Sequence, residues 1–222
     1  MGRPDRGGTG PRPLTGSGRV PVALPRLMLV TDRLETRGRD LVDVVEAAVA
    51  GGVELVQVRE RGLPEPEVEV LLRRLLDRLR WTPARVLING HPALAQRLGI
   101  GLHLPASAPS PPPPGPVFCG RAVHDEVEAH RALTDSAAYV VVGPVFPTGS
   151  KPGHAGVGLE ALASLARMVD PVPAFAIGGL TPERVAPVRA AGAYGVAVRS
   201  AILGSPDPAR AAAAFVDVLT PT

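Results

Sequence analysis

The sequence predicts an α/β fold in which eight parallel strands close into a (β/α)8 TIM barrel. Eight short apolar runs recur along the chain, and nearly all are separated by segments whose apolar residues have helical spacing. Parallel strands joined by helical crossovers form an open doubly wound sheet or a closed barrel, and a count of eight favours the barrel. The segment Val30-Thr31-Asp32-Arg33 follows the first strand, in place of the Gly-rich turn expected of an open sheet.

The strands are predicted from apolar runs of three to five residues, each short enough for a barrel strand. In chain order they are Leu27 to Val30, Leu55 to Val58, Val86 to Ile88, Gly101 to Leu104, Val117 to Gly120, Ala138 to Val142, Ala174 to Ile177 and Gly195 to Val198.

The helices are predicted from apolar residues that recur at intervals of three and four positions. The clearest example begins at Val68 and repeats its leucines through Leu79. Thr181-Pro182 has the composition of a helix start, with a capping hydroxyl and proline at the first helical position. The remaining helices are predicted at Asp40 to Ala50, Ala93 to Leu98, Asp125 to Ala132, Leu159 to Met168 and Pro208 to Leu219.

Two segments are predicted to lack regular structure. Residues 1–25 contain six glycines and five prolines without apolar periodicity, so we expect a disordered tail followed by a single barrel domain over residues 26–222. Residues 105–116 contain seven prolines, so a loop is expected where the helix after the fourth strand would lie.

Composition excludes several classes of protein. The segment Met1 to Arg26 has no apolar core of a signal peptide, and the single Cys119 has no partner for an internal disulfide, so we expect a cytoplasmic protein. No run approaches the roughly 18 uncharged apolar residues of a membrane helix. The 24 basic residues are scattered among 21 acidic ones and only 3% of residues are aromatic, which argues against nucleic-acid binding. A homo-oligomer is compatible with the sequence.

Polar residues follow the predicted strands at their carboxyl ends, where barrel enzymes form their sites. After the first six strands these are Thr31, Asp32, Gln57, Arg59, Glu60, Arg61, Asn89, His103, His124, Thr148, Ser150 and Lys151. After strands seven and eight they are Gly178, Gly179, Arg199 and Ser200.

Gly178 and Gly179 are expected to form half of a phosphate site, because backbone N–H groups without Cβ atoms beside them can approach an anion closely. Val198, Arg199 and Ser200 would supply the other half through backbone N–H groups and the Ser200 hydroxyl. The alternative is an ordinary tight turn.

The loop after the sixth strand contains Thr148, Ser150 and Lys151, the only lysine of the chain. We expect these residues to contact a phosphate or a carboxylate, although Lys151 is alternatively a solvated loop residue. His124 can exchange a proton near neutral pH and is the candidate acid–base group, its alternative being a helix-capping or core histidine. His103, in an apolar strand, is interpreted as structural. No metal-ligand constellation is recognised, so no metal is expected.

Five ordered motifs resemble the thiamine phosphate synthase superfamily, over roughly residues 27–217. The matching motifs are Leu29-Val30-Thr31-Asp32, Val56-Gln57-Val58-Arg59-Glu60-Arg61, Gly143-Pro144-Val145-Phe146-Pro147-Thr148, Ile177-Gly178-Gly179-Leu180-Thr181-Pro182 and Gly195-Val196-Ala197-Val198-Arg199-Ser200-Ala201-Ile202.

Two branches share these motifs. The synthase branch joins a pyrimidine diphosphate to a thiazole phosphate and holds Mg²⁺ with aspartates after strands three and four. Here the two stretches read Ile88-Asn89-Gly90-His91 and His103-Leu104-Pro105-Ala106-Ser107, without those aspartates. These departures resemble the TenI-type thiazole tautomerases, as does Gly120-Arg121-Ala122-Val123-His124.

The tautomerase resemblance implies an isomerase of thiamine biosynthesis that aromatises a carboxythiazole phosphate by proton transfer, without a metal or another cofactor. It implies that His124 exchanges the proton and that Gln57, Arg59, Asn89 and Lys151 contact the small-molecule substrate. Two alternatives stay open: a Mg²⁺-dependent thiamine phosphate synthase, and a non-catalytic regulator that binds a thiazole phosphate.

Overall fold

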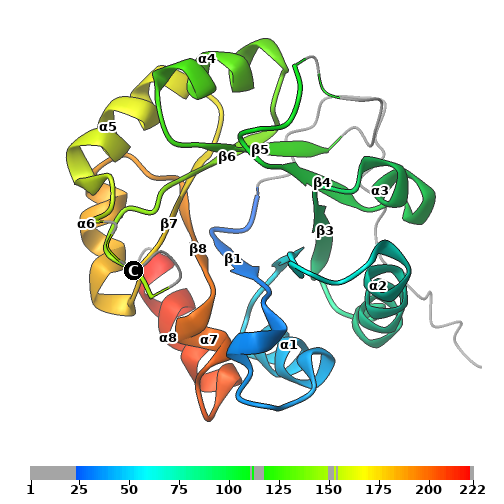
Figure 1. Ribbon diagram of the computed structural model, residues 1–222. Helices are drawn as coiled ribbons and strands as arrows, with labels where there is room; N and C mark the ends of the chain where they lie inside the picture. The colour runs from blue at the N-terminus through cyan, green and yellow to red at the C-terminus, as the bar shows by residue number, and fades with distance from the viewer. Residues whose placement is uncertain (1–23, 111, 113–117, 150–152, 154, 221–222) are drawn as a thin grey trace, which may run out of the picture.

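A computed structural model describes residues 24–110, 112, 118–149, 153 and 155–220. Its eight parallel strands form a closed barrel in the order β1 to β8, and β8 pairs with β1 to complete the ring (Figure 1). The (β/α)8 prediction is therefore confirmed. The strands are β1 Leu27–Val30, β2 Leu55–Val58, β3 Arg85–Asn89, β4 Gly101–Leu104, β5 Cys119–Val123, β6 Tyr139–Val142, β7 Ala174–Ile177 and β8 Gly195–Val198.

Helices surround this ring and cover the outer face of the strands (Figure 1). They begin where the sequence places capping groups, as at Asp40, whose carboxylate accepts the Val42 N–H at 2.8 Å. The helices are α1 Leu41–Ala50, α2 Glu65–Leu79, α3 Pro92–Leu98, α4 Glu126–Thr134, α5 Gly158–Val169, α6 Val185–Ala190, α7 Ser200–Leu203 and α8 Pro208–Leu219, with short 3₁₀ turns at Arg33–Glu35 and Pro182–Arg184.

The core has two layers, because alternate strand residues face opposite sides of the sheet. Residues facing outward pack against the apolar stripes of the helices. Residues facing inward fill the barrel, where Met28, Tyr139 and Phe175 are fully buried. The aromatic rings of Tyr139 and Phe175 meet edge to face with centroids 5.8 Å apart. The interior below the mouth of the barrel is therefore a packed core.

Three local features differ from the expectations. The fifth strand spans Cys119–Val123 rather than Val117 to Gly120, because the fully buried Arg121 is part of the strand. After β7 the chain forms a 3₁₀ turn before α6, and the Thr181 side chain makes no capping hydrogen bond to the backbone. The short helix α7, which directly follows β8, was not expected.

The predicted irregular segments lie partly outside the described residues. Residues 1–23 of the expected tail lie outside the described residues, whereas Leu24 is described and is buried against the inner core. Within the described part of residues 105–116 there is no helix between β4 and β5. No described helix is long and apolar enough to span a membrane.

Candidate active site

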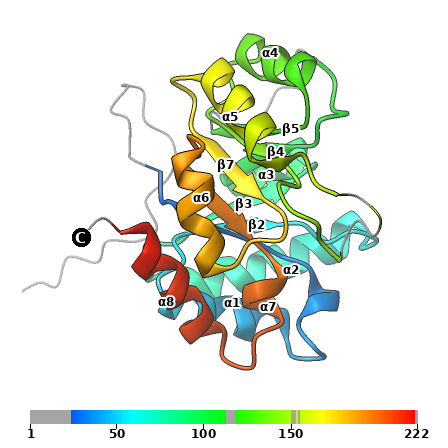
Figure 2. The same ribbon diagram turned by 90° about the vertical axis from the view of Figure 1, so that its left-hand side faces the viewer.

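A pocket of about 250 Å³ opens at the carboxyl ends of the strands, and segments at the ends of all eight strands line it. This end of the barrel lies on the same side as the loop after β6 in Figure 2, opposite the beginning of β1. The sequence-predicted residues that line the pocket are Gln57, Arg59, Asn89, His124, Thr148, Gly178, Gly179, Val198, Arg199 and Ser200. Ser150 and Lys151 lie outside the described residues.

The two glycines after β7 have positive φ angles, 103° at Gly178 and 62° at Gly179. A Cβ atom on Gly178 would lie 2.5 Å from the Cβ of Pro144, and one on Gly179 would lie 2.5 Å from the carbonyl oxygen of Pro147. Close packing against the segment after β6 therefore requires glycine here. Within the described residues, the N–H group of neither glycine donates a hydrogen bond, so both donors stay available at the pocket.

Arg199 lines the pocket, but its guanidinium group forms ion pairs with two carboxylates of the loop after β1. Its nitrogens lie 3.2 Å from Asp32 and 2.8 Å from Glu35. The side chain thus joins the ends of β8 and β1, and the backbone around Ser200 is the part of this segment that can receive an anion.

The end of β2 is held by a buried hydrogen-bond network that the sequence did not reveal. The Thr31 hydroxyl donates to the Glu60 carboxylate at 2.5 Å and accepts the Arg59 N–H at 3.0 Å. The same carboxylate accepts the Arg33 N–H at 2.9 Å and is buried. These contacts fix the backbone that carries Arg59 toward the pocket. Thr31 and Glu60 are therefore positioning residues.

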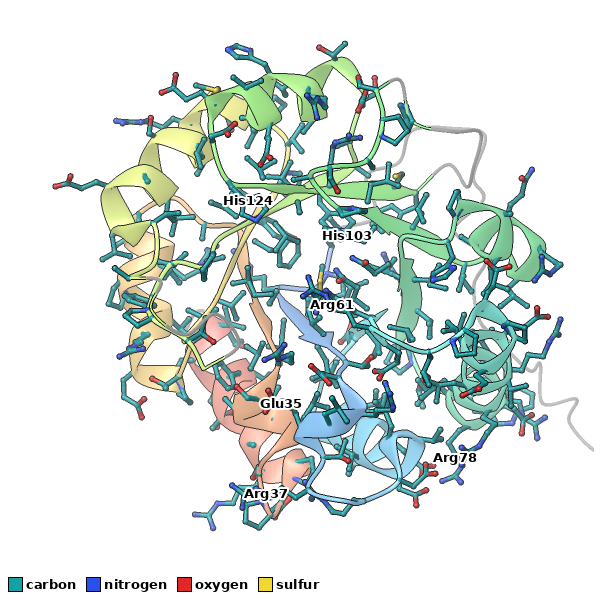
Figure 3. All side chains as sticks on the ribbon, in the orientation of Figure 1. Glu35, Arg37, Arg61, Arg78, His103 and His124 are labelled. Carbon is teal, nitrogen blue, oxygen red and sulfur yellow. The ribbon has the colours of Figure 1, made fainter. Side chains whose placement is uncertain are left out.

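Arg59 and Arg61 bring positive charge to the pocket that no described carboxylate within 4.0 Å neutralises. Burial lowers the pKa of the Arg59 guanidinium, and the charges of Arg61 and Arg199 lower it further. Figure 3 shows Arg61 near the centre of the ring of strands. An anion in this pocket would relieve the repulsion among the three cations.

The floor of the pocket is polar but uncharged. His103 is buried, and its Nδ1 lies 3.1 Å from the hydroxyl of Tyr139. Burial, together with the charges of Arg59 and Arg121, lowers the pKa of His103 to about 3, so the imidazole is neutral at physiological pH. The interpretation of His103 as structural is incomplete, because this residue also lines the pocket.

His124 directly follows β5, and its side chain points to the pocket, as Figure 3 shows. Its Nδ1 lies 2.9 Å from the carboxylate of Glu128, which also accepts the His124 backbone N–H at 2.7 Å. Asp125 caps helix α4, which contains Glu128, by accepting the Glu128 N–H at 2.8 Å. The first turn of α4 therefore orients the imidazole and leaves Nε2 for a ligand.

A buried ion pair supports the wall around His124. Arg121 and Asp135 are joined at 2.7 Å with both side chains almost inaccessible to solvent. Arg121 also donates to the carbonyl oxygens of Ala108 and Pro109, and thereby anchors the start of the proline-rich loop. Sequence alone could not identify this pair, because the residue type of an arginine does not show whether its side chain is buried or exposed.

The described residues do not fit a magnesium site. Among them, no group of three or more His, Cys, Asp or Glu side chains could hold a metal ion. The stretches to which the resemblance assigns the metal-binding aspartates, residues 88–91 and 103–107, contain no carboxylate, and Asn89, Pro105 and Ala106 from these stretches line the pocket. The carboxylates of Asp32 and Glu60 are already engaged with arginine or threonine. Oxygen ligands with negative charge are what Mg²⁺ requires, and here arginine and amide donors take their place.

Comparison with known proteins gives concordant matches. A family model described as thiamine monophosphate synthase matches residues 27–202. A putative thiamine-phosphate synthase from Geobacter sulfurreducens is 38% identical, with 88% of this chain and 94% of that protein covered. A thiamine-phosphate synthase from Roseiflexus castenholzii is 37% identical, with 86% of each chain covered. The structure of thiamine phosphate pyrophosphorylase from Pyrococcus furiosus superposes with a TM-score of 0.76 at 27% identity, covering 87% of this chain and 95% of the other.

These matches correct the functional expectation. The relatives are named as synthases, so the expected thiazole tautomerase activity, and with it the isomerase class, was wrong. The expectation rested on the missing aspartates. Aspartates of this kind determine how phosphate charge is neutralised, and they do not determine which bond is formed. The five sequence motifs and the family match agree over the same part of the chain. This chain belongs to the thiamine monophosphate synthase family.

Proposed function

We propose that the protein is a transferase that joins a pyrimidine diphosphate to a thiazole phosphate and forms thiamine phosphate, the reaction that the names of its relatives imply. The two substrates carry three phosphoryl groups and the product carries one, so inorganic diphosphate is released. The thiazole ring bonds to the carbon that carries the diphosphate, and the electrons of the broken C–O bond leave with the diphosphate. No oxidation or reduction occurs.

The observation that carries this proposal is the cluster formed by Arg59, Arg61 and Arg199 in a pocket that also contains the glycine turn. Charge develops on the leaving oxygen in the transition state, and fixed cations stabilise it strongly where water is partly excluded. Arg59 and Arg61 are suited to this task because guanidinium groups bind phosphate oxygens in a bidentate manner. They act in place of a metal ion in this proposal.

The thiazole phosphate is assigned to the turn at Gly178 and Gly179, whose two N–H donors are available. Thr148, Ser200 and the backbone of Val198 complete this subsite from the neighbouring strand ends. We retain Ser150 and Lys151 as proposed phosphate contacts from the loop after β6. The two anion subsites then lie on different walls of one pocket, so each substrate is held by its own phosphate.

The neutral groups position the rings between these subsites. Gln57 and Asn89 line the pocket and offer amide donors and acceptors to a heterocycle. His124, oriented by Glu128, contacts the substrate through Nε2. The reaction transfers no proton overall, so we assign His124 to binding and orientation.

The direct test is incubation of the purified protein with both substrates, with product detected by chromatography. We expect thiamine phosphate and diphosphate in equal amounts, and an initial rate for both products that is at least tenfold lower in Arg59→Gln. The matched control is Arg167→Gln, which removes an exposed arginine of α5 that does not line the pocket. Binding of both substrates without any product would contradict the transferase assignment and favour a non-catalytic binding protein.

A further inference from the structure

A second cavity, of about 460 Å³, lies at the opposite end of the barrel, where β7 and β8 begin. In Figure 2 this end is the one at which β1 begins, away from the loop after β6. Arg26, Arg189 and Tyr194 are among the residues that line it. None of them lines the active-site pocket, so the two cavities are separate.

Two guanidinium groups meet in this cavity on a single acceptor. The Nη1 of Arg26 donates to the carbonyl oxygen of Tyr194 at 3.0 Å, and the Nη1 of Arg189 donates to the same oxygen. Arg189 also donates to the carbonyl oxygen of Ala193 at 2.5 Å. Arg26 lies over the Tyr194 ring, with its guanidinium carbon 5.0 Å from the ring centroid. Both cations are thus held by Ala193 and Tyr194, in the segment before β8.

No described carboxylate lies within 4.0 Å of either guanidinium group. Asp170 lines the same cavity, but its side chain pairs with neither arginine. Burial lowers the pKa of Arg189, and the charge of Arg26 lowers it further, which shows that the two like charges repel each other. Like charges held together without a counter-charge repel each other, and a bound anion adds an attractive interaction with both cations that offsets this repulsion.

The arginines retain the donors that such an anion needs. Each guanidinium has five N–H groups, and only Nη1 of each is engaged within the described residues. The remaining Nε and Nη2 donors match the oxygen spacing of a phosphate group, which arginine binds through two parallel hydrogen bonds. A cavity of about 460 Å³ has room for a phosphate or a diphosphate with bound water.

We propose that Arg26 and Arg189 form a second anion site, at the amino-terminal end of the barrel, for a small phosphate-type oxyanion. The site is independent of the proposed transferase reaction and of the residues assigned to it. Its occupant joins the segment before β1 to the end of α6 and the start of β8. Bound anion therefore stabilises the closure of the barrel, because a ligand that binds only the folded state raises the free energy of unfolding.

The test uses inorganic phosphate as a calorimetric probe at low ionic strength, with the intact protein and three variants. Arg26→Gln and Arg189→Gln are each expected to weaken one class of phosphate sites at least tenfold and to leave turnover without added phosphate unchanged. Arg85→Gln is the matched control, because Arg85 begins β3 at the same end of the barrel and does not line the cavity. Its titration should match that of the unmodified protein.

A second measurement needs no variant and locates the anion directly. Crystals of the unmodified protein soaked in tungstate, a heavy analogue of phosphate, should show an anomalous peak between the Arg26 and Arg189 side chains. Tungstate found only at the active-site pocket, or phosphate titrations of both glutamine variants that match those of the intact protein, would overturn the proposal. Failure of the transferase assay leaves both readouts intact, so the two proposals fail separately.

Discussion

Replacing Arg59 by glutamine is expected to change stability and activity in opposite directions. Arg59 is partly buried beside Arg61 and Arg199, and burial together with these two charges lowers the pKa of its guanidinium, so its surroundings disfavour the charge. Glutamine removes that charge and keeps a polar side chain. The free energy of unfolding without ligand should therefore rise, whereas binding and turnover of the diphosphate substrate should fall.

The magnitudes follow from the surroundings of the side chain. Relief of the repulsion is expected to add about 0.5–1 kcal/mol, since water still screens a guanidinium that is only partly buried. For a chain of this length, that corresponds to an increase of about 1–4 °C in Tm. Loss of one hydrogen bond from a charged donor costs about 1.5–3 kcal/mol. This is roughly a 10- to 100-fold decrease in kcat/KM, and a bidentate contact would double the loss in free energy.

Thermal unfolding and initial-rate measurements on the same preparations test both signs together. Arg59→Lys provides the comparison that keeps the charge without the bidentate geometry, and we expect its kcat/KM to lie between those of the unmodified protein and Arg59→Gln. A glutamine variant that is less stable than the unmodified protein yet fully active would refute the reasoning, because the arginine would then serve the fold rather than the ligand.

Three further substitutions test the surrounding structure. Gly179→Ala should lower the free energy of unfolding by about 1–3 kcal/mol and weaken phosphate binding, because its Cβ meets a carbonyl oxygen at 2.5 Å. Gly99→Ala has a similar φ of 65° in open space, so chemical denaturation should show a smaller loss and phosphate titration no change. The His103 pKa of about 3 lies below its unfolded value of 6.5, so the stability it contributes is present above pH 6.5 and lost as the pH falls. Between pH 7 and pH 5 the loss is about 2 kcal/mol, and His103→Gln should remove that part of the pH dependence in urea titrations. Asp135→Asn should destabilise the fold by about 3–5 kcal/mol, since it leaves a buried arginine unpaired, whereas Asp77→Asn breaks only an exposed pair and should cost about 1 kcal/mol or less. Equal losses in the two aspartate variants would disprove the buried-pair account.

The fold was predictable because barrel formation depends on the number and order of apolar runs, which are local properties of the sequence. The strand that shifted was β5, where the side chain of Arg121 lies inside the wall of the barrel. Hydrophobic patterning places an arginine at the surface by default. Its position depends on Asp135, fourteen residues away, and on carbonyl oxygens of the proline-rich loop.

The location of the pocket was also predictable, because the carboxyl ends of parallel strands meet at one end of a barrel. The orientation of its side chains could not be predicted from the sequence. Arg199 turns toward Asp32 and Glu35, and these partners come from the segment after β1, at the other end of the sequence. The Thr31–Glu60 network has the same character, since it joins two loops that the pairing of β1 with β2 brings together.

The error in function has a specific cause. The absence of aspartates near Asn89 and Pro105 was interpreted as the loss of synthase chemistry. Charge neutralisation is a physical requirement that guanidinium groups can also meet, and the cluster around Arg59 is visible only once the strands are closed. The absence of metal ligands from a motif therefore indicates how charge is neutralised, and it does not determine which reaction is catalysed.

We propose that the arginines that line this pocket neutralise the diphosphate leaving group. The most direct measurement is the rate of thiamine phosphate formation from both substrates in excess EDTA, compared with the rate in added Mg²⁺. Product is expected to form in EDTA, and the rate in EDTA is expected to fall at least tenfold in Arg59→Gln. A rate that is zero in EDTA and restored by Mg²⁺, or a lack of product under both conditions, would contradict this proposal.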